Sequence, residues 1–203
     1  MKVLMLSGGL DSTILFYDLL FNEDRFQCAF IDYGQKNAVA ELKAAKNLCC
    51  KNNVVLQVYC IPSLFAGVSS TLLRGIEGVH SIASDEIPNR NATLACVVAA
   101  QQQARSELIF GAHKTSSGYA DAKPQFYTRL SKLLSWSTNG KVTASAPYIR
   151  LTKKQLIMRA WKVLALTKEE ISESISCYEG NNCGKCPACI ARKKALEDSP
   201  YEK

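Results

Sequence analysis

The chain has 203 residues, of which 47% are hydrophobic and 21% charged, so we expect one packed domain of ordinary size with at most a small appendage, and no wholesale disorder. The formal net charge of +7 favours a solubilising surface, with an anionic partner such as a nucleotide or RNA as the alternative; because the basic residues are scattered, nucleic acid is not the first expectation. No apolar run approaches the roughly 20 residues that cross a bilayer, and the first residues show no signal-peptide pattern, so we expect a cytoplasmic protein without a membrane partner.

Strand and helix patterns alternate along the chain. Short apolar runs bounded by glycine or polar residues predict strands, and apolar residues at helical spacing predict helices. A long loop rich in Ser, Gly and Thr is predicted at 62–88. In chain order the predicted elements are strand 2–6, helix 11–21, strand 26–34, helix 37–53, strand 54–61, helix 91–106, strand 107–112, helix 124–138, strand 142–149 and helix 152–164. This alternation predicts an α/β fold, a parallel sheet covered by helices on both faces.

Three segments follow predicted strands and are expected to share one edge of that sheet. Ligands of such sheets bind beyond the carboxyl ends of the strands, near the point where the strand order reverses. Residues 7–12, 32–35 and 111–114 come directly after or at the end of the first, second and fourth strands. We therefore expect a ligand site along this edge.

The segment Leu6–Phe16, LSGGLDSTILF, places a Gly-Gly turn before a helix. Gly8 and Gly9 allow positive φ and let an anion approach the backbone amides. Asp11 and Ser12 fall in the first helical turn, where free N–H groups and the helix dipole favour a phosphate. The lysine of a Walker P-loop and the third glycine of a dinucleotide-binding loop are both missing. A Gly-Gly turn capped by Asp and Ser is also a common structural feature without a ligand.

As a block, SGGLDST resembles the pyrophosphate loop (PP-loop) of the N-type ATP pyrophosphatases. Those enzymes cleave ATP between the α and β phosphates and attach AMP to a substrate oxygen. The resemblance implies a Rossmann-like, doubly wound fold, Mg²⁺ bound with ATP, and a loop that holds the departing pyrophosphate, which accounts for the missing lysine. It implies catalytic roles for Ser7, Asp11 and Ser12. It implies ATP contacts from Leu6, Ser7, Gly8, Gly9, Leu10, Asp11, Ser12, Ala29, Phe30, Ile31 and Gly111.

Four of the nine cysteines lie close together near the C-terminus. In a chain expected to be cytoplasmic, they favour a metal site over disulfides. Four thiolates satisfy the tetrahedral preference of Zn²⁺ and leave no open position, which predicts a structural zinc that holds the C-terminal tail in place. An iron–sulfur cluster is the alternative, since spacing alone does not separate the two. The predicted ligands are Cys177, Cys183, Cys186 and Cys189.

The loop and the cysteine cluster together resemble the 7-cyano-7-deazaguanine synthase (QueC) family. Segments 30–37, 87–95, 116–126 and 146–156 resemble further motifs of that family, so the resemblance covers nearly the whole chain. It implies a PP-loop ATP pyrophosphatase domain over 1–165, a helical tail with the zinc site over 166–203, and possible homodimers. It also implies a ligase that converts 7-carboxy-7-deazaguanine, ammonia and ATP to 7-cyano-7-deazaguanine (preQ0), AMP and pyrophosphate, as in queuosine biosynthesis.

The chemistry of that reaction fits the residues present. Carboxylate, amide and nitrile share one oxidation level, so no redox cofactor is needed. No glutaminase domain fits in 203 residues, so free ammonia is the expected nitrogen donor. Protein groups need only position the reactants and neutralise the phosphates.

The family resemblance assigns roles to residues outside the loop, each with a structural alternative. Arg90 would pair with a phosphate or the substrate carboxylate; the structural alternative is a surface arginine. Lys153 would bind the polyphosphate; the structural alternative is that it only begins a helix. Asn91 alternatively caps a helix, and Asp121 alternatively forms a turn. A lone histidine is more often structural, so His113 stays outside the catalytic set. The predicted substrate-binding residues are Tyr33, Gln35, Asn91, Tyr119 and Asp121.

The acceptor end departs from the family pattern. Ala120, Ala122 and Lys123 replace proline, cysteine and arginine; Thr115 stands where an acidic residue is usual, and Asn37 where histidine is common. Lysine does not substitute for arginine where a planar fork must hold an anion. One alternative is therefore a QueC-like enzyme of antiphage defence, which passes the activated deazaguanine acyl group to a protein amine. A tRNA-modifying PP-loop enzyme is the second alternative, and a zinc-knuckle binding module without catalysis the third.

Overall fold

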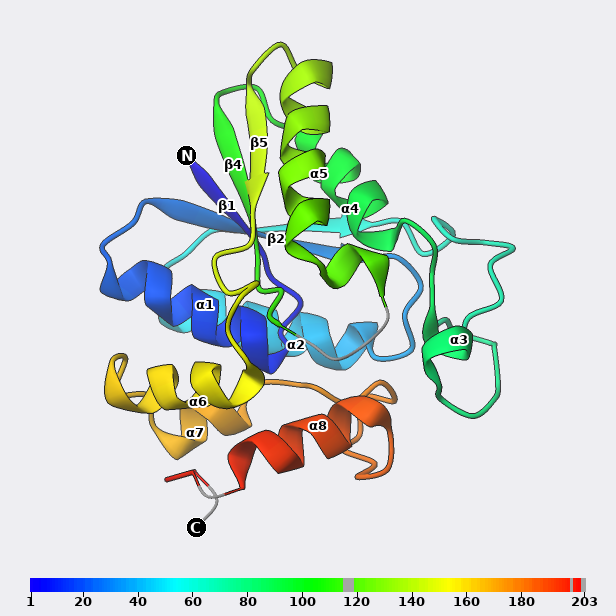
Figure 1. Cartoon of the computed structure of the whole chain (residues 1–203), viewed down its shortest axis with the longest axis vertical. Helices are drawn as coiled ribbons and strands as arrows, with labels where there is room; N and C mark the ends of the chain where they lie inside the picture. Colours follow the sequence, from blue (N-terminus) through cyan, green and yellow to red (C-terminus); the bar gives the residue numbers. More distant parts are fainter. Residues whose placement is uncertain (115–118, 198, 202–203) are drawn as a thin grey trace.

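A computed structural model describes residues 1–114, 119–197 and 199–201. Five parallel strands form one sheet in the order β3-β2-β1-β4-β5 (Figure 1). This confirms the predicted α/β fold with a parallel sheet. The strands are β1 (Lys2–Met5), β2 (Phe26–Asp32), β3 (Leu56–Cys60), β4 (Ser106–Phe110) and β5 (Val142–Ser145).

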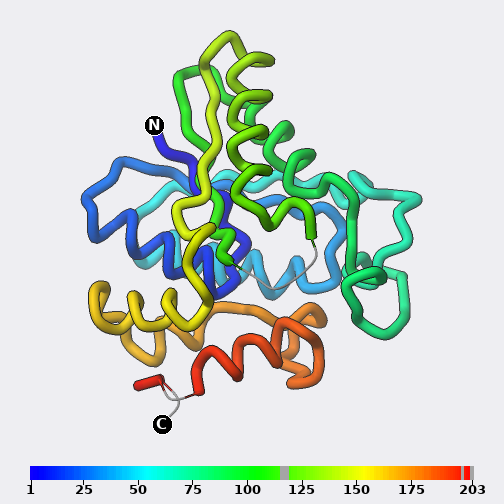
Figure 2. The backbone as a smooth tube through the Cα atoms, in the orientation of Figure 1, coloured from blue at the N-terminus to red at the C-terminus, as the bar shows by residue number. Residues whose placement is uncertain are grey.

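Helices cover both faces of the sheet, as expected for a doubly wound fold. Figure 2 shows α4 and α5 on one side and α1 with the tail helices on the other. The helices are α1 (Leu10–Phe21), α2 (Ala38–Lys51), α3 (Ile82–Asp85), α4 (Arg90–Ala99), α5 (Pro124–Ser137), α6 (Lys153–Lys162), α7 (Lys168–Ser172) and α8 (Pro187–Leu196), with a 3₁₀ turn at Ala120–Ala122.

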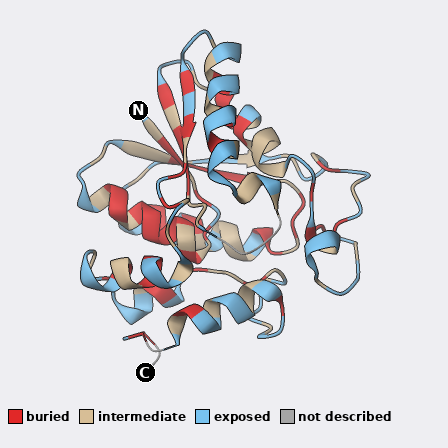
Figure 3. Ribbon diagram, viewed as in Figure 1, coloured by how far each residue is buried: buried red, intermediate tan, exposed pale blue. Residues whose placement is uncertain are grey.

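Helix α1 is buried on most of its surface, because it lies between the sheet and the tail helices (Figure 3). Its one buried carboxylate, Asp18, is fully paired: Arg159 donates two hydrogen bonds of 2.6 and 3.0 Å, and the Tyr148 hydroxyl donates a third of 2.9 Å. A buried charge without such partners would be strongly destabilising. The cluster fixes α6 against α1 and so fixes the start of α6 relative to the sheet edge.

The strand order reverses between β1 and β4, which are direct neighbours. Their carboxyl ends therefore bring segments 6–9 and 111–114 together, with the end of β2 next to them. This is the switch point at which doubly wound sheets bind ligands. The predicted meeting of residues 7–12, 32–35 and 111–114 at one edge is confirmed.

Two predicted boundaries are wrong. Helix α4 ends at Ala99 and does not reach residue 106, because the chain must turn to bring Ser106 into β4, where its N–H bonds to Lys141. Strand β5 ends at Ser145 because Pro147 has no N–H to continue a ladder. No helix in the described part of the chain is long and apolar enough to span a membrane.

Candidate active site

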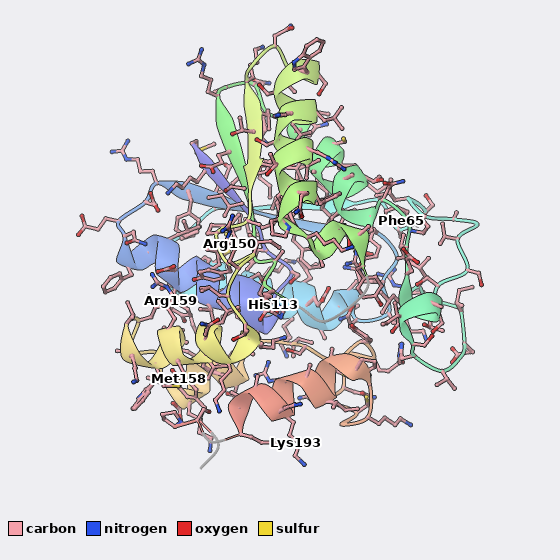
Figure 4. The ribbon with its side chains drawn as sticks, viewed as in Figure 1. Phe65, His113, Arg150, Met158, Arg159 and Lys193 are labelled. Atoms are coloured by element: carbon pink, nitrogen blue, oxygen red, sulfur yellow. The ribbon has the colours of Figure 1, made fainter. Side chains whose placement is uncertain are left out.

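A cavity of about 570 Å³ opens at the switch point of the sheet. Its wall is formed by the ends of β1, β2 and β4 and by the starts of α1, α4 and α6. The short helix α3 and residues from the 175–191 segment of the tail complete it. Figure 4 shows His113 at the centre of this region, beside the start of α1. The volume of the cavity is in the range of sites for nucleotide-sized ligands.

The loop between β1 and α1 is built for close backbone approach. Gly8 has φ +74°, and a Cβ there would lie 2.5 Å from the Glu41 carbonyl oxygen, so the position requires glycine. Gly9 is the N-cap of α1, and its N–H donates to Ser7 Oγ at 3.2 Å. Ser12 lies in the first turn and shares a 3.1 Å hydrogen bond with Ser7. The loop presents hydroxyls and helix N–H groups to the cavity, as an anion site requires.

Asp11 lies in the first turn of α1 beside two basic side chains. Lys153 Nζ is 3.2 Å and His113 Nδ1 3.4 Å from Asp11 Oδ2. Burial lowers the pKa of His113, so its ring is neutral near pH 7 and Lys153 is the cation of this group. The second oxygen, Asp11 Oδ1, is buried and has no hydrogen-bond partner among the described residues. A free carboxylate oxygen of this kind is the ligand that a hard cation such as Mg²⁺ takes.

The wall beside the loop is apolar and tightly packed. Leu6, Ala29 and Ile31 line it and are almost entirely buried. Gly111, directly after β4, touches the start of α1: a Cβ there would lie 3.0 Å from Ser12 N. Glycine at 111 thus lets the end of β4 approach the helix N-terminus closely. This wall is suited to a flat, apolar face such as a nucleobase.

The opposite side of the cavity carries Arg90, the first residue of α4. It follows Asn89, whose φ of 58° turns the chain into the helix. The Arg90 guanidinium interacts electrostatically with the Tyr33 side chain. Asn91 is not the helix cap, which is Asn89; its side chain bonds instead to Tyr127. Arg90 therefore faces the cavity as the cation on this side.

Glu41 is the acidic residue of this side, and the sequence patterns did not single it out. Its carboxylate accepts hydrogen bonds from Gln35 Nε2 at 3.2 Å and from Asn37 Nδ2 at 3.0 Å. Burial raises the pKa of Glu41 to about 7. A carboxyl group near half-ionisation at neutral pH is suited to proton transfer.

The tail is part of the cavity wall and touches the loop between β1 and α1 directly. The N–H of Ile175 donates to Gly8 O at 2.8 Å, and Asn37 Nδ2 donates to Cys177 O at 3.0 Å. Arg192 of α8 holds the same segment by donating to Ser174 O at 3.1 Å. The sequence predicted that the cysteine cluster holds the tail in place; the structure adds that this tail closes one side of the cavity.

The long loop 62–88 is held against the cavity by two groups of ionic contacts, which we call the Arg74 anchor and the His80 clasp. Arg74 donates two 2.7 Å hydrogen bonds to Asp32, at the end of β2. His80 bonds through Nδ1 to Asp85 at 2.6 Å and through Nε2 to Glu179 at 2.9 Å. The clasp thus joins the loop to the tail beside the cavity, which Asp85 lines.

The four predicted metal ligands come together. The sulfur atoms of Cys177, Cys183, Cys186 and Cys189 all lie within 4.8 Å of one another. Backbone N–H groups point at the sulfurs, at 3.3 Å from Cys183 N to Cys177 Sγ and 3.4 Å from Cys186 N to Cys183 Sγ. Burial acts to raise the pKa of Cys177, but hydrogen bonds from the backbone N–H groups of Cys183, Asn181 and Glu179 outweigh it and lower the pKa to about 6. The cluster is compatible with zinc, which binds thiolates.

The family model described as "Queuosine biosynthesis protein QueC" matches residues 1–199. The chain belongs to the QueC family. The 7-cyano-7-deazaguanine synthase of Desulfotalea psychrophila is 30% identical over 207 residues, covering 96% of this chain and 93% of that protein. A synthase of the same name from Picrophilus torridus is 31% identical, with 97% and 87% covered. The 7-cyano-7-deazaguanine synthase 1 of Colwellia psychrerythraea is 29% identical, with 98% of each chain covered. QueC membership agrees with the resemblance stated from the motifs.

Most of the site residues expected from the QueC resemblance meet in the one cavity. Gly8 and Asp121 do not line it. Gly8 packs against α2, and Asp121 lies in the 3₁₀ turn, where its negative charge acts to raise the pKa of Arg90. Thr115 and the first part of the 116–126 motif lie outside the described residues. The predicted residues that line the cavity are Leu6, Ser7, Gly9, Leu10, Asp11, Ser12, Ala29, Phe30, Ile31, Tyr33, Gln35, Arg90, Asn91, Gly111, Tyr119 and Lys153.

Sequence reasoning missed Glu41 and the tail residues Ser176 and Tyr178 as parts of the cavity, and it noted Asn37 only as a departure from the family pattern at the acceptor end. Glu41 lies in the first turn of a helix that follows a strand end, and this is the one sequence signal that favours it. Nothing in the sequence pattern relates Ser176 or Tyr178 to the sheet edge. His113, set aside as structural, lies beside Asp11 in the cavity.

Proposed function

We propose that this QueC-family protein is an ATP-dependent ligase that adenylates 7-carboxy-7-deazaguanine and aminates it to 7-cyano-7-deazaguanine, releasing AMP and pyrophosphate. The observation that carries the proposal is the single cavity that joins the Ser7–Ser12 loop to the Arg90 side. A phosphate site and an acceptor site must share one space if AMP is to pass between them. The names of the relatives supply the product, 7-cyano-7-deazaguanine.

On the phosphate side, the loop amides and the α1 N-terminus would hold the departing pyrophosphate, and Lys153 would neutralise its charge. Asp11 would hold Mg²⁺ through its unpartnered oxygen. When bound with ATP, Mg²⁺ supplies positive charge to the phosphates. The adenine would lie on the apolar wall at Ala29–Ile31.

On the acceptor side, Arg90 would pair with the carboxylate of the deazaguanine and aim one oxygen at the α-phosphate. Arg90 suits this role because its planar guanidinium can hold a carboxylate through two parallel hydrogen bonds. Tyr119 lines the same side, and Asp121 lies close enough to act on the charge of Arg90. Tyr119 would contact the polar edge of the base, and Asp121, which does not line the cavity, would act through Arg90. Four thiolates around zinc would hold the tail that closes this side.

Acyl transfer to a protein amine is the alternative, favoured by the small side chains in the 3₁₀ turn Ala120–Ala122 beside Tyr119. Both reactions begin with the same adenylation and differ in the amine. A tRNA-modifying activity is a further alternative.

Mass spectrometry of the products separates these possibilities. The protein is incubated with ATP, Mg²⁺, 7-carboxy-7-deazaguanine and ammonium, and the expected product is free 7-cyano-7-deazaguanine with AMP. Amide or adenylate without nitrile would favour acyl transfer to a protein. ATP cleavage that needs tRNA and ignores the free base would contradict the proposal.

A further inference from the structure

The three carboxylates that line the cavity differ in their partners. Asp11 has Lys153 at 3.2 Å, and Asp85 has His80 at 2.6 Å. Glu41 has no basic side chain within ion-pair distance in the described part of the chain; both its direct partners are neutral amides. Among the described residues, Glu41 is therefore the cavity carboxylate without an ion-pair partner, and Arg90 acts on it only from beyond ion-pair distance.

The first amide is fixed by the chain after β2. Gln35 Nε2 donates to Ile31 O at 3.1 Å as well as to Glu41, and Gln35 Oε1 accepts from Tyr33 N at 2.9 Å. These backbone bonds set which end of the amide faces Glu41. The carboxylate is therefore held in one orientation at the edge of the cavity.

The second amide links Glu41 to the tail. Asn37 Nδ2 donates both to Glu41 Oε1 and to Cys177 O, and Asn37 is buried. A carboxylate has about four acceptor positions, so two amide bonds leave acceptor positions free for a ligand in the cavity. Glu41 is thus positioned and still has capacity to accept a proton.

The environment sets its proton affinity. Burial raises the pKa of Glu41 to about 7, against the opposing effects of the two amides and of Arg90, the charged group that faces it from α4. A base works best when its pKa lies near the working pH.

The chemistry of the proposed function requires such a base. Ammonia is mostly ammonium at neutral pH, and an alkylamine is likewise mostly protonated, so the nucleophile must lose a proton to expose its lone pair. After attack on the acyl adenylate, the nitrogen of the tetrahedral intermediate carries a positive charge and must lose a proton before the amide forms.

We propose that Glu41 is the base that takes the proton from the attacking amine; this inference rests on the proposed function. The nitrogen lone pair forms the C–N bond, Glu41 accepts one N–H proton, and the C–O bond to AMP breaks with its electron pair leaving on AMP. The products are the amide, AMP and protonated Glu41, which then releases its proton to solvent. No oxidant or reductant is involved.

The test compares Glu41→Gln with the wild-type protein in two half-reactions. The first is exchange of labelled pyrophosphate into ATP in the presence of 7-carboxy-7-deazaguanine, which needs no amine. The second is amide and nitrile formation from ammonium. We expect exchange within about twofold of wild type and amide formation reduced about 100-fold, the usual range for loss of a general base.

Two further measurements distinguish a base from a structural group. At a fixed concentration of free ammonia, amide formation by the wild type should rise as the pH increases through about 7, because Glu41 must be ionised, and this rise should vanish in Glu41→Gln. Hydroxylamine is unprotonated at neutral pH, and the nitrogen that it brings to the tetrahedral intermediate is a stronger acid that can lose its proton to water. Hydroxamate formation should therefore fall far less than amide formation. Glu41→Asp, which keeps the carboxylate, should recover part of the ammonium-dependent rate.

Loss of exchange in Glu41→Gln, or a raised KM for 7-carboxy-7-deazaguanine, would overturn the inference, since Glu41 would then bind the base or support the fold. Equal loss with ammonium and hydroxylamine would also overturn it. Absence of exchange in the wild-type protein would instead overturn the proposed function, and this inference with it.

Discussion

The two sides of the cavity are built in different ways. The phosphate side comes mainly from one short stretch of chain, the Ser7–Ser12 loop, whose shape follows from two glycines and a helix start. The acceptor side is assembled from α2, α4, the loop 62–88 and the tail, which are joined by side-chain contacts. A site built locally can be altered without disturbing the rest, whereas a wall built from distant segments depends on every contact that joins them.

The largest expected effect lies on the phosphate side. Asp11→Asn removes a negative charge that pairs with Lys153 and that we assign to Mg²⁺ binding. Pyrophosphate exchange should fall about 10²–10³-fold, the usual cost of losing one group that stabilises developing charge. Binding of 7-carboxy-7-deazaguanine, measured by calorimetry, should change little.

The matched control is Asp24→Asn, which removes a carboxylate paired with Lys2 at the opposite edge of the sheet. It should leave both measurements unchanged. Loss of deazaguanine binding in Asp11→Asn would show that the two sides are not separable.

A smaller effect on chemistry, together with a loss of stability, is expected from the cysteine cluster. Cys186→Ser removes one of four thiolates and should lower Tm by roughly 5–10 °C, as for a loss of about 2–3 kcal/mol in a domain of this size. Because the tail closes the acceptor side, nitrile formation should fall more than pyrophosphate exchange.

The control for this variant is Cys96→Ser, which changes an exposed cysteine outside the cluster and should leave Tm unchanged. Metal content by mass spectrometry of the intact protein should drop with Cys186→Ser alone. An equal loss of exchange and nitrile formation would mean that the tail supports the phosphate loop as strongly as the acceptor wall.

The smallest effect is expected at the His80 clasp. Burial opposes charging of the ring, but bonds to Asp85 and Glu179 outweigh it and raise the pKa of His80. His80→Ala should raise the KM for 7-carboxy-7-deazaguanine about three- to fivefold, since partly exposed ion pairs contribute up to about 1 kcal/mol each. Steady-state kinetics at pH 6.5 measures this, with kcat nearly unchanged.

Lys51→Met serves as its control, because it breaks an exposed pair with Glu173 away from the cavity. A change of KM in this control equal to that in His80→Ala would show that the clasp has no particular role at the cavity.

The same contrast explains what could be predicted from the sequence. The Ser7–Ser12 loop could be singled out from the sequence because its residues are consecutive and each obeys a local rule for glycine, for a helix start or for a buried strand. The cysteine cluster was found because its spacing is short. Both signals exist before the chain folds.

The acceptor wall could not be found in this way. Asn37 bonds to Cys177, 140 positions along the chain, and His80 bonds to Glu179, 99 positions along. Such pairs depend on how α2 and the tail pack over the sheet edge, which no periodicity encodes. Glu41 became visible as a cavity residue only once Gln35 and Asn37 were placed around it.

The central claim is that the α1 loop binds the pyrophosphate that leaves when AMP is attached to the deazaguanine carboxylate. The most direct measurement follows α-labelled and γ-labelled ATP separately, with 7-carboxy-7-deazaguanine present or withheld. The account predicts that the α label appears in AMP and the γ label in pyrophosphate, and that both products depend on the deazaguanine. Release of ADP and orthophosphate, with no AMP, would contradict it.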